Sequence, residues 1–405
     1  MRVLWFVNIA FPALNKNTGL KVTPFGGWMY SLSDLLTGRN DIELTIACTS
    51  SDIEAIEHYN FDGINYVILP DYKRQPTELK GFDKYVGYCL RAIDSYKPDL
   101  VEVYGTERYF GLIGDRTGIP VIIRIQGVMN EIVKYFFGPL KFSEITRYPS
   151  LVRIYLRYKN QCKIEKEIFL RNKIYNGRSF WAESVLHDYV VDPIYFHVDT
   201  VLRPQFYAAK WDINKANRNT IYCTSKLHSY KGVDVLIRAL RILKKSVPTV
   251  SLRIAGHIPD KGFGRYLFKL VQRLGLEKNV CFVGQIGPDD VALEIERAHA
   301  YVLPSFIENT PQSLAEAQVV GCPSVASYTG GVPTYAANGK AALMFPRGDH
   351  AVLAARLSKL LENDELASEL SERGRNIARN RHDPKTVLNA LLSQYEKVLC
   401  GNLRS

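Results

Sequence analysis

Residues 303–317, which read LPSFIENTPQSLAEA, are the stretch that decides the fold. A short apolar run ends near Leu303, and a helical pattern begins after Thr310, which can cap a helix that has Pro311 at its first position. A strand that runs into a helix start is a building block of doubly wound α/β sheets. Free backbone amides at a helix start can bind an anion, so we expect a phosphate-binding site here.

Apolar runs and helical patterns alternate on both sides of this stretch. Strands are predicted at residues 3–7, 44–48, 66–69, 100–103 and 121–125, and again at 221–223, 252–255, 280–283, 301–303 and 324–326. Helices are predicted at residues 28–36, 78–96, 233–244, 263–274, 289–299 and 312–320. Strands with little polar alternation that are separated by helices are typical of parallel sheets covered on both faces. The chain is therefore predicted to be α/β, with two Rossmann-like doubly wound domains that face a central cleft.

The net charge and the cysteine content restrict the ligands and the cellular compartment that suit this protein, but they do not identify its function. The 405 residues carry a formal net charge of +11, an excess that suits phosphorylated ligands, an anionic membrane or nucleic acid. Seven scattered cysteines form no C-x-x-C pair, which indicates reduced, buried thiols. The N-terminal apolar run is too short for a signal peptide, and no window reaches the ~18 apolar residues of a membrane span. We therefore expect a cytoplasmic protein.

Two glutamates and the segments after them carry a resemblance to a known family. Glu308 and Glu316 are separated by seven residues, and the segments GCPSVAS (321–327) and GGVP (330–333) follow them. This run resembles the donor-site signature of the retaining glycosyltransferases of family 4, which have the GT-B fold. The resemblance implies a nucleotide diphosphate sugar as donor and retention of the anomeric configuration.

The resemblance also implies that the two domains bind different substrates. Residues 1–205 are expected to form the acceptor-binding N-terminal domain, and residues 206–383 the donor-binding C-terminal domain. The last segment, residues 384–405, is expected to form a helix that crosses back to the N-terminal domain. The polar, turn-prone stretch 204–219 marks the seam between the domains.

The helix start at the end of the opening stretch suggests separate roles for the donor-binding residues. A pyrophosphate bound beside Asn309, Thr310 and Pro311 would place the attached ribose within reach of Glu316. The Glu316 carboxylate can accept hydrogen bonds from both hydroxyls of a cis-diol. Glu308 can accept from hydroxyls of the sugar beyond the phosphates, and a covalent bond to it is not expected.

A second stretch, IYCTSKLHSYKGVD at residues 221–234, resembles the phosphate clamp of the same family. The family pattern is Gly-Arg-Leu, three residues, then Lys-Gly. This chain has Ser225 and Lys226 in place of Gly-Arg and keeps Lys231. Lysine neutralises a phosphate as a point charge but lacks the bidentate fork of arginine. We predict that Lys226 and Lys231 act with Glu308 in catalysis; the alternative is two ordinary solvated lysines.

Three further places match the family less closely. Gly26 and Gly27 resemble its N-terminal glycine loop, which approaches the donor phosphate or the acceptor; the alternative is a tight turn. Gln126 stands where the family often has a histidine that touches the donor sugar. Glutamine cannot ionise, but it can donate and accept hydrogen bonds, so Gln126 is predicted to contact the sugar or the acceptor; the alternative is a loop residue without function. Arg178, which follows a strand-like stretch at 173–175, is predicted to bind a donor or acceptor phosphate, with a structural salt bridge as the alternative.

Residues between 134 and 204 suggest which class of acceptor the enzyme uses. Segments 176–181, 195–199 and 202–204 resemble members of the family that build bacterial surface polysaccharides such as capsule and O-antigen. Between residues 134 and 178 basic and aromatic side chains interleave, which suits an anionic membrane beside a lipid-linked acceptor. A long amphipathic helix with a solvated basic face is the alternative, and nucleic acid is not expected.

The resemblance therefore implies a retaining hexosyltransferase-like enzyme that transfers a sugar from a UDP-sugar to a glycan or lipid-linked acceptor. No D-x-D, P-loop or histidine–cysteine cluster is present, so no cofactor and no metal are expected. We expect the enzyme to act in the cytoplasm; the alternative location is the inner face of the plasma membrane. The alternatives are a GT-B nucleotide-sugar epimerase and a catalytically silent nucleotide-sugar-binding subunit.

Overall fold

The computed structural model describes residues 1–18 and 27–402, which form two compact units. Unit 1 contains Met1–Asn130, Tyr158–Val201 and His382–Ser405, and unit 2 contains Glu131–Arg157 and Leu202–Arg381. This division differs from the boundaries expected above, because Glu131–Arg157 packs with unit 2 although it belongs to the first half of the chain. The chain passes between the units within α4 (Met129–Ile132) and α6 (Pro149–Arg171).

Unit 1 is built on an eight-stranded sheet with the order β3-β4-β2-β1-β5-β6-β7-β8. Its strands are β1 (Arg2–Phe6), β2 (Glu43–Ser50), β3 (Glu57–Phe61), β4 (Ile64–Pro70), β5 (Leu100–Tyr104), β6 (Val121–Arg124), β7 (Ile174–Gly177) and β8 (Ile194–His197). Neighbouring strands are parallel apart from the antiparallel pair β3–β4. Asp62 and Gly63 close that hairpin with positive φ, as the Asp-Gly dipeptide favours.

Helices cover both faces of the unit 1 sheet. They include α1 (Pro12–Thr18), α2 (Gly27–Thr37), η1 (Leu79–Phe82), α3 (Asp83–Tyr96), η2 (Tyr109–Ile113), α7 (Phe180–Leu186) and α16 (Pro384–Leu399). Alternate side chains of β1 point to opposite faces. Leu4 and Phe6 therefore pack in the cluster that contains α3, whereas Val3 and Trp5 pack in the cluster that contains α2 and α16.

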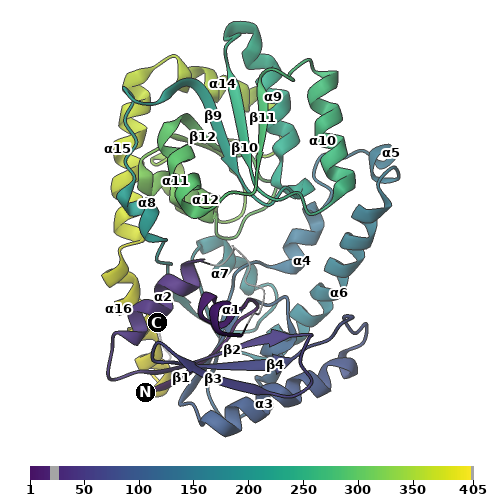
Figure 1. Ribbon diagram of the computed structural model, residues 1–405, viewed down its shortest axis with the longest axis vertical. Coiled ribbons are helices and arrows are strands. Elements are labelled where there is room, and N and C mark those ends of the chain that lie inside the picture. The colour runs from purple at the N-terminus through teal and green to yellow at the C-terminus, as the bar shows by residue number, and fades with distance from the viewer. Residues whose placement is uncertain (19–26, 403–405) are drawn as a thin grey trace. The chain divides into compact units, whose positions relative to one another are not determined.

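A buried polar network fixes α16 in unit 1. The Tyr395 hydroxyl donates to Glu102 of β5, and Trp5 Nε1 donates to the Tyr395 oxygen at 3.0 Å. Arg124 of β6 pairs with Glu102 at 3.0 Å, and both side chains are fully buried. A buried charge requires such partners because it has lost its hydration. Figure 1 shows α16, in yellow, beside α2.

Unit 2 is built on a six-stranded sheet with the order β11-β10-β9-β12-β13-β14, in which each neighbouring pair is parallel. Its strands are β9 (Asn217–Thr224), β10 (Ser251–Ala255), β11 (Val280–Gly284), β12 (Ala298–Leu303), β13 (Ser324–Tyr328) and β14 (Leu343–Pro346). Its helices include η3 (Val133–Tyr135), α5 (Phe142–Ile145), α8 (Pro204–Ala208), η4 (Ser229–Lys231), α9 (Val233–Ser246), α10 (Lys261–Arg273), α11 (Pro288–Arg297), α12 (Gln312–Val320), α13 (Val332–Tyr335), η5 (Ala337–Gly339), α14 (His350–Leu361) and α15 (Asp364–Arg381). One continuous apolar cluster fills its core.

The predicted α/β class with two Rossmann-like sheets is confirmed. Three strands, β3, β8 and β14, were not predicted from the sequence. β3 alternates half-buried and exposed residues at the edge of its sheet, and β8 and β14 have four residues each. Short edge strands bury little apolar surface, so they carry a weak hydrophobic pattern.

Candidate functional site

Lys231 and Glu308 meet at the carboxyl end of the unit 2 sheet. Lys231 ends η4, which follows β9, and Glu308 lies in the loop after the adjacent strand β12. Lys231 Nζ lies 2.6 Å from Glu308 Oε1, and Ser305 Oγ donates to the same oxygen at 2.8 Å. The two side chains are 19% and 10% exposed. This charge-assisted hydrogen bond orients both groups while leaving them within reach of a ligand.

Backbone contacts hold the loop that carries Glu308. Gly330 has φ +47°, and a Cβ at this position would collide with the Glu308 carbonyl oxygen. Gly331 N donates to that same carbonyl at 2.9 Å. On its other side, Phe306 N donates to Tyr230 O at 2.7 Å, next to Lys231. The GGVP segment of the signature thus fixes the position of Glu308.

Glu316 lies in α12 and pairs with an arginine that the sequence analysis did not assign to the site. Arg203 Nη2 lies 3.5 Å from Glu316 Oε1, and the Glu316 side chain is 8% exposed. Burial raises the pKa of Glu316 to about 7, although Arg203 acts in the opposite direction. The sequence signals for Arg203 are its place in the segment 202–204 noted above and before Pro204, which begins α8, and neither signal points to Glu316. Its partner is more than a hundred residues away, so spacing alone could not have found it.

The N-cap of α12 lies one residue later than predicted. Pro311, with φ −75° and ψ 75°, occupies the N-cap position, and the helix begins at Gln312. Thr310 was expected to be the cap and lies one residue earlier, because proline's fixed ring and missing N–H suit the helix boundary. Asn309 is buried, and the three residues lead directly into the free amides of α12.

Lys226 and His228 lie between β9 and Lys231. Lys226 is exposed, whereas the His228 ring stacks on Tyr230 with 5.1 Å between ring centroids. Burial lowers the pKa of His228 to about 3, and Lys231 and Lys226 add to this effect by repelling a proton. The imidazole is therefore neutral near pH 7. It was not singled out from the sequence, because a lone histidine between two lysines carries no pattern.

The remaining predicted residues lie in unit 1. Gln126 is half-buried and follows β6, and Arg178 is 2% exposed and follows β7. Both positions are at the carboxyl edge of the parallel sheet, where doubly wound folds bind ligands. Gly27 begins α2, whereas Gly26 lies outside the described residues. The roles assigned to these residues stay predictions.

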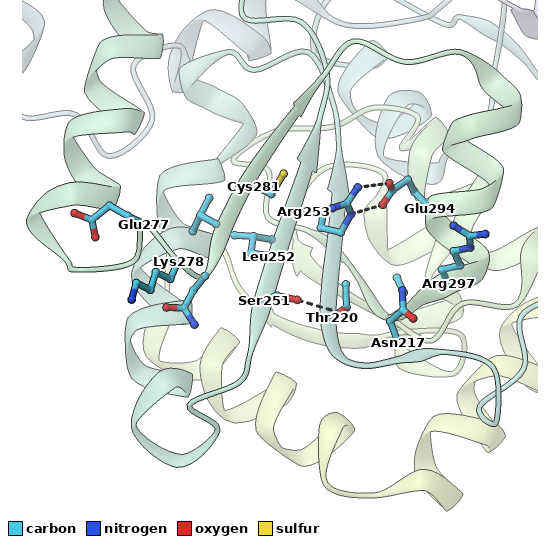
Figure 2. A pocket seen from close by; sticks show the side chains of 13 residues that line it. Asn217, Thr220, Ser251, Leu252, Arg253, Glu277, Lys278, Cys281, Glu294 and Arg297 are labelled. Carbon is cyan, nitrogen blue, oxygen red and sulfur yellow. Dashed lines mark hydrogen bonds and ion pairs between the residues drawn. The ribbon is translucent and has the colours of Figure 1, made fainter.

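Cavities open at both ends of the unit 2 strands. One of about 600 Å³ lies at the amino-terminal ends of β9, β10 and β11, and Figure 2 shows that Arg253 there faces Glu294. It contains none of the predicted donor residues. The other, of about 670 Å³, lies at the carboxyl ends of β13 and β14 and is lined by Gly330 and Arg347. Because Gly330 packs on the Glu308 backbone, this second cavity adjoins the candidate site.

Within residues 1–18 and 27–402, the His, Cys, Asp and Glu side chains do not gather in groups of three or more that could hold a metal ion. The expected absence of a metal stays a prediction. No helix in this part of the chain combines the length and the apolar composition that crossing a bilayer requires.

Comparison with known proteins finds a family match over the part of unit 2 that carries this site. Residues 207–377 match the family model described as glycosyl transferases group 1. D-inositol 3-phosphate glycosyltransferase of Corynebacterium efficiens is 29% identical over 158 residues, which is 38% of this chain and 37% of that protein. The chain spans between 37% and 50% of the length of the curated relatives that it matches first.

Solved structures resemble the chain over nearly its whole length. Anabaena HepE in complex with UDP has a TM-score of 0.69 and 16% identity, and the match covers 98% of this chain and 100% of that one. WaaG, a glycosyltransferase involved in lipopolysaccharide biosynthesis, has a TM-score of 0.68 and 17% identity, with coverage of 96% and 98%. At this level of identity the likeness establishes the fold, which is GT-B.

Proposed function

We propose that this chain, which carries a glycosyl transferases group 1 domain on a GT-B fold, is a retaining glycosyltransferase that uses a nucleotide diphosphate sugar. The observation that carries the proposal is the Lys231–Glu308 pair beside the start of α12. These groups lie at the carboxyl edge of a parallel sheet and inside the segment that matches the family. Fold likeness alone would not support an activity, but these side chains match the chemistry.

The unit 2 residues suit the parts of such a donor. The free amides of α12 can bind the diphosphate, and Lys226 and Lys231 can offset its charge. A lysine ammonium has three donors, so Lys231 can contact Glu308 and a phosphate oxygen together. Glu316 is buried beside this helix start and suits the ribose hydroxyls. Glu308 then orients the sugar through its hydroxyls.

In the proposed reaction the bond from the sugar anomeric carbon to the diphosphate oxygen breaks. The acceptor oxygen forms its bond to that carbon on the same face, and the acceptor proton passes to the departing diphosphate. Charge on the diphosphate increases as the bond breaks, so a lysine aimed at that oxygen stabilises the transition state more than the ground state. A neutral His228 leaves the positive charge with the two lysines.

The donor base and the acceptor are narrower proposals. A uridine nucleotide is supported by the fold shared with HepE, whose structure contains UDP. A role in bacterial surface polysaccharide synthesis is supported by the fold shared with WaaG and by the sequence resemblance. Gln126 and Arg178, at the carboxyl edge of the unit 1 sheet, are proposed to contact the donor sugar or the acceptor.

A membrane-adjacent acceptor is supported by the surface of α5 and the first turns of α6. Phe142 is 81% exposed and Leu156 is 58% exposed, and Arg153 and Arg157 are exposed close to Leu156 on α6. Exposed apolar side chains flanked by arginines suit the interface of an anionic bilayer. This part of unit 2 is the proposed membrane-facing surface.

A donor-turnover assay with purified protein tests the proposal. The protein would be incubated with UDP-sugars, and the products would be followed by NMR. Slow release of UDP and free sugar supports transfer, and an α-configured first product from an α-configured donor supports retention. A changed sugar still attached to UDP would mean an epimerase, and no binding and no turnover across UDP-, GDP- and ADP-sugars would overturn the proposal.

A further inference from the structure

The carboxylate of Glu165 joins two loops at the carboxyl edge of the unit 1 sheet. Glu165 lies in α6 and is fully buried. One loop, residues 125–128, leads from β6 to α4, and the other, residues 105–108, leads from β5 to η2. The proposed reaction does not use this carboxylate. Burying a carboxylate costs free energy unless hydrogen-bond donors replace the water that it loses.

Four hydrogen bonds reach this one carboxylate. Oε1 accepts from Met129 N at 2.8 Å, and Oε2 accepts from Asn130 N at 2.8 Å. Asn130 Nδ2 donates to Oε2 at 2.7 Å, and the Thr106 hydroxyl contacts Oε1. Thr106 Oγ1 also lies 3.2 Å from Gly127 O. The loop after β5 and the start of α4 are therefore held by a single side chain of α6.

Gln126 lies between two fixed points. On one side, Ile125 N donates to Asn176 O of β7 at 2.8 Å. On the other side, the Met129 amide is held by Glu165, with Gly127 and Val128 between. So short a segment has little freedom once both ends are fixed.

We propose that Glu165 is a positioning residue that fixes Gln126 for sugar transfer. The inference rests on the proposed function, which assigns Gln126 to the donor sugar or the acceptor. A displacement of about 1 Å in a group that orients substrate can cost on the order of a hundredfold in rate. Glu165 would therefore affect turnover although it contacts no substrate.

Backbone hydrogen exchange tests the anchoring independently of activity. Glu165→Gln keeps the shape of the side chain but turns an NH₂ group toward one of the donors. Exchange should become faster for Met129 and Asn130, while β1 and β5 stay protected. Exchange should be measured at pH 8, where the Glu165 carboxyl is ionised, because burial raises its pKa to about 7. If exchange at Met129 and Asn130 is unchanged, the anchoring is wrong.

A double-mutant cycle on kcat/KM tests positioning against general stability. Glu165→Gln and Gln126→Ala should each lower kcat/KM for transfer by about tenfold to a hundredfold. The double variant should be little worse than the more damaging single variant, because both changes remove the same oriented group. Multiplying effects would overturn the positioning role.

Two more variants complete the experiment. Glu167→Gln makes the same chemical change on α6 at a half-buried residue paired with Arg171, and should leave kcat/KM near wild type. If Glu165→Gln does not fold, Thr106→Val removes one contact to Glu165 and should show the same non-additivity with Gln126→Ala. UDP affinity, a property of unit 2, should be unchanged in all variants. A wild-type protein without turnover would refute the proposed function, and the exchange data would still decide the anchoring.

Discussion

Glu316 is a residue whose protonation state should control nucleotide binding. Burial raises its pKa to about 7, so below that pH the carboxyl is protonated and loses acceptor capacity for the ribose hydroxyls. UDP affinity should therefore rise as pH increases from 6 to 8. Calorimetry would measure UDP affinity across this pH range for the wild type and for Glu316→Gln. The titration of UDP itself affects both proteins equally, so the difference between them reports on Glu316. Equal pH dependence in the two proteins would contradict the ribose role.

Lys231 should matter more for the rate than for donor binding. Lys231→Ala removes a cation from the leaving group, and losing one such donor typically costs ~3–4 kcal/mol, or roughly a hundred- to a thousandfold in kcat. Lys231→Gln is the matched variant, because it can still hydrogen-bond Glu308 but carries no charge. Lys359→Ala, on the exposed face of α14, is the control. If donor affinity and kcat fall by the same factor, the transition-state role is wrong.

Metal removal tests whether the lysines are sufficient. Turnover should survive excess EDTA, because Lys226 and Lys231 can offset the charge that a divalent ion would otherwise neutralise. The assay is donor hydrolysis before and after dialysis against the chelator. Loss of activity that Mg²⁺ or Mn²⁺ restores would show that a metal takes part.

At the scale of elements, α5 and the start of α6 should determine membrane binding. Phe142→Ser and Leu156→Ser should each weaken binding to vesicles that contain phosphatidylglycerol, because the exposed side chains no longer bury apolar surface in the bilayer interface. Arg153→Gln should weaken it by ~1 kcal/mol at low salt. Vesicle co-sedimentation would measure all three.

The control for this surface is Val191→Ser, which changes another strongly exposed apolar side chain, 83% exposed, outside α5 and α6. It should bind vesicles like the wild type. Binding to neutral phosphatidylcholine vesicles should be weak throughout. If Val191→Ser weakens binding as much as Leu156→Ser does, the membrane-facing surface has been placed incorrectly.

At the scale of the whole molecule, α16 ties the end of the chain to its beginning. Tyr395→Phe removes a donor from buried Glu102 and leaves Trp5 without its acceptor, so it should lower the free energy of unfolding by ~1–3 kcal/mol. Urea denaturation would measure the loss. Tyr328→Phe, at a 63% exposed tyrosine, should change it by less than ~0.5 kcal/mol. Equal effects would mean that the network does not stabilise α16.

The sequence by itself determined the local elements and the order of the donor motifs. The expected helix at 312–320 coincides with α12, and the strands around it follow from uninterrupted apolar runs. Glu308, Glu316 and Lys231 could be named because short runs of neighbouring residues around them resemble the donor-site motifs of a known family. Periodicity and capping act over a few residues, so the sequence displays them directly.

Only the tertiary structure decided which distant residues meet. The pairing of Arg203 with Glu316, the anchoring of two loops by Glu165 and the packing of Glu131–Arg157 in unit 2 leave no local signal. Each depends on contacts between segments far apart in the chain, and many pairings of charged side chains are compatible with one hydrophobic pattern. Burial then selects among them, because a carboxylate that loses its water must find donors wherever the fold places them.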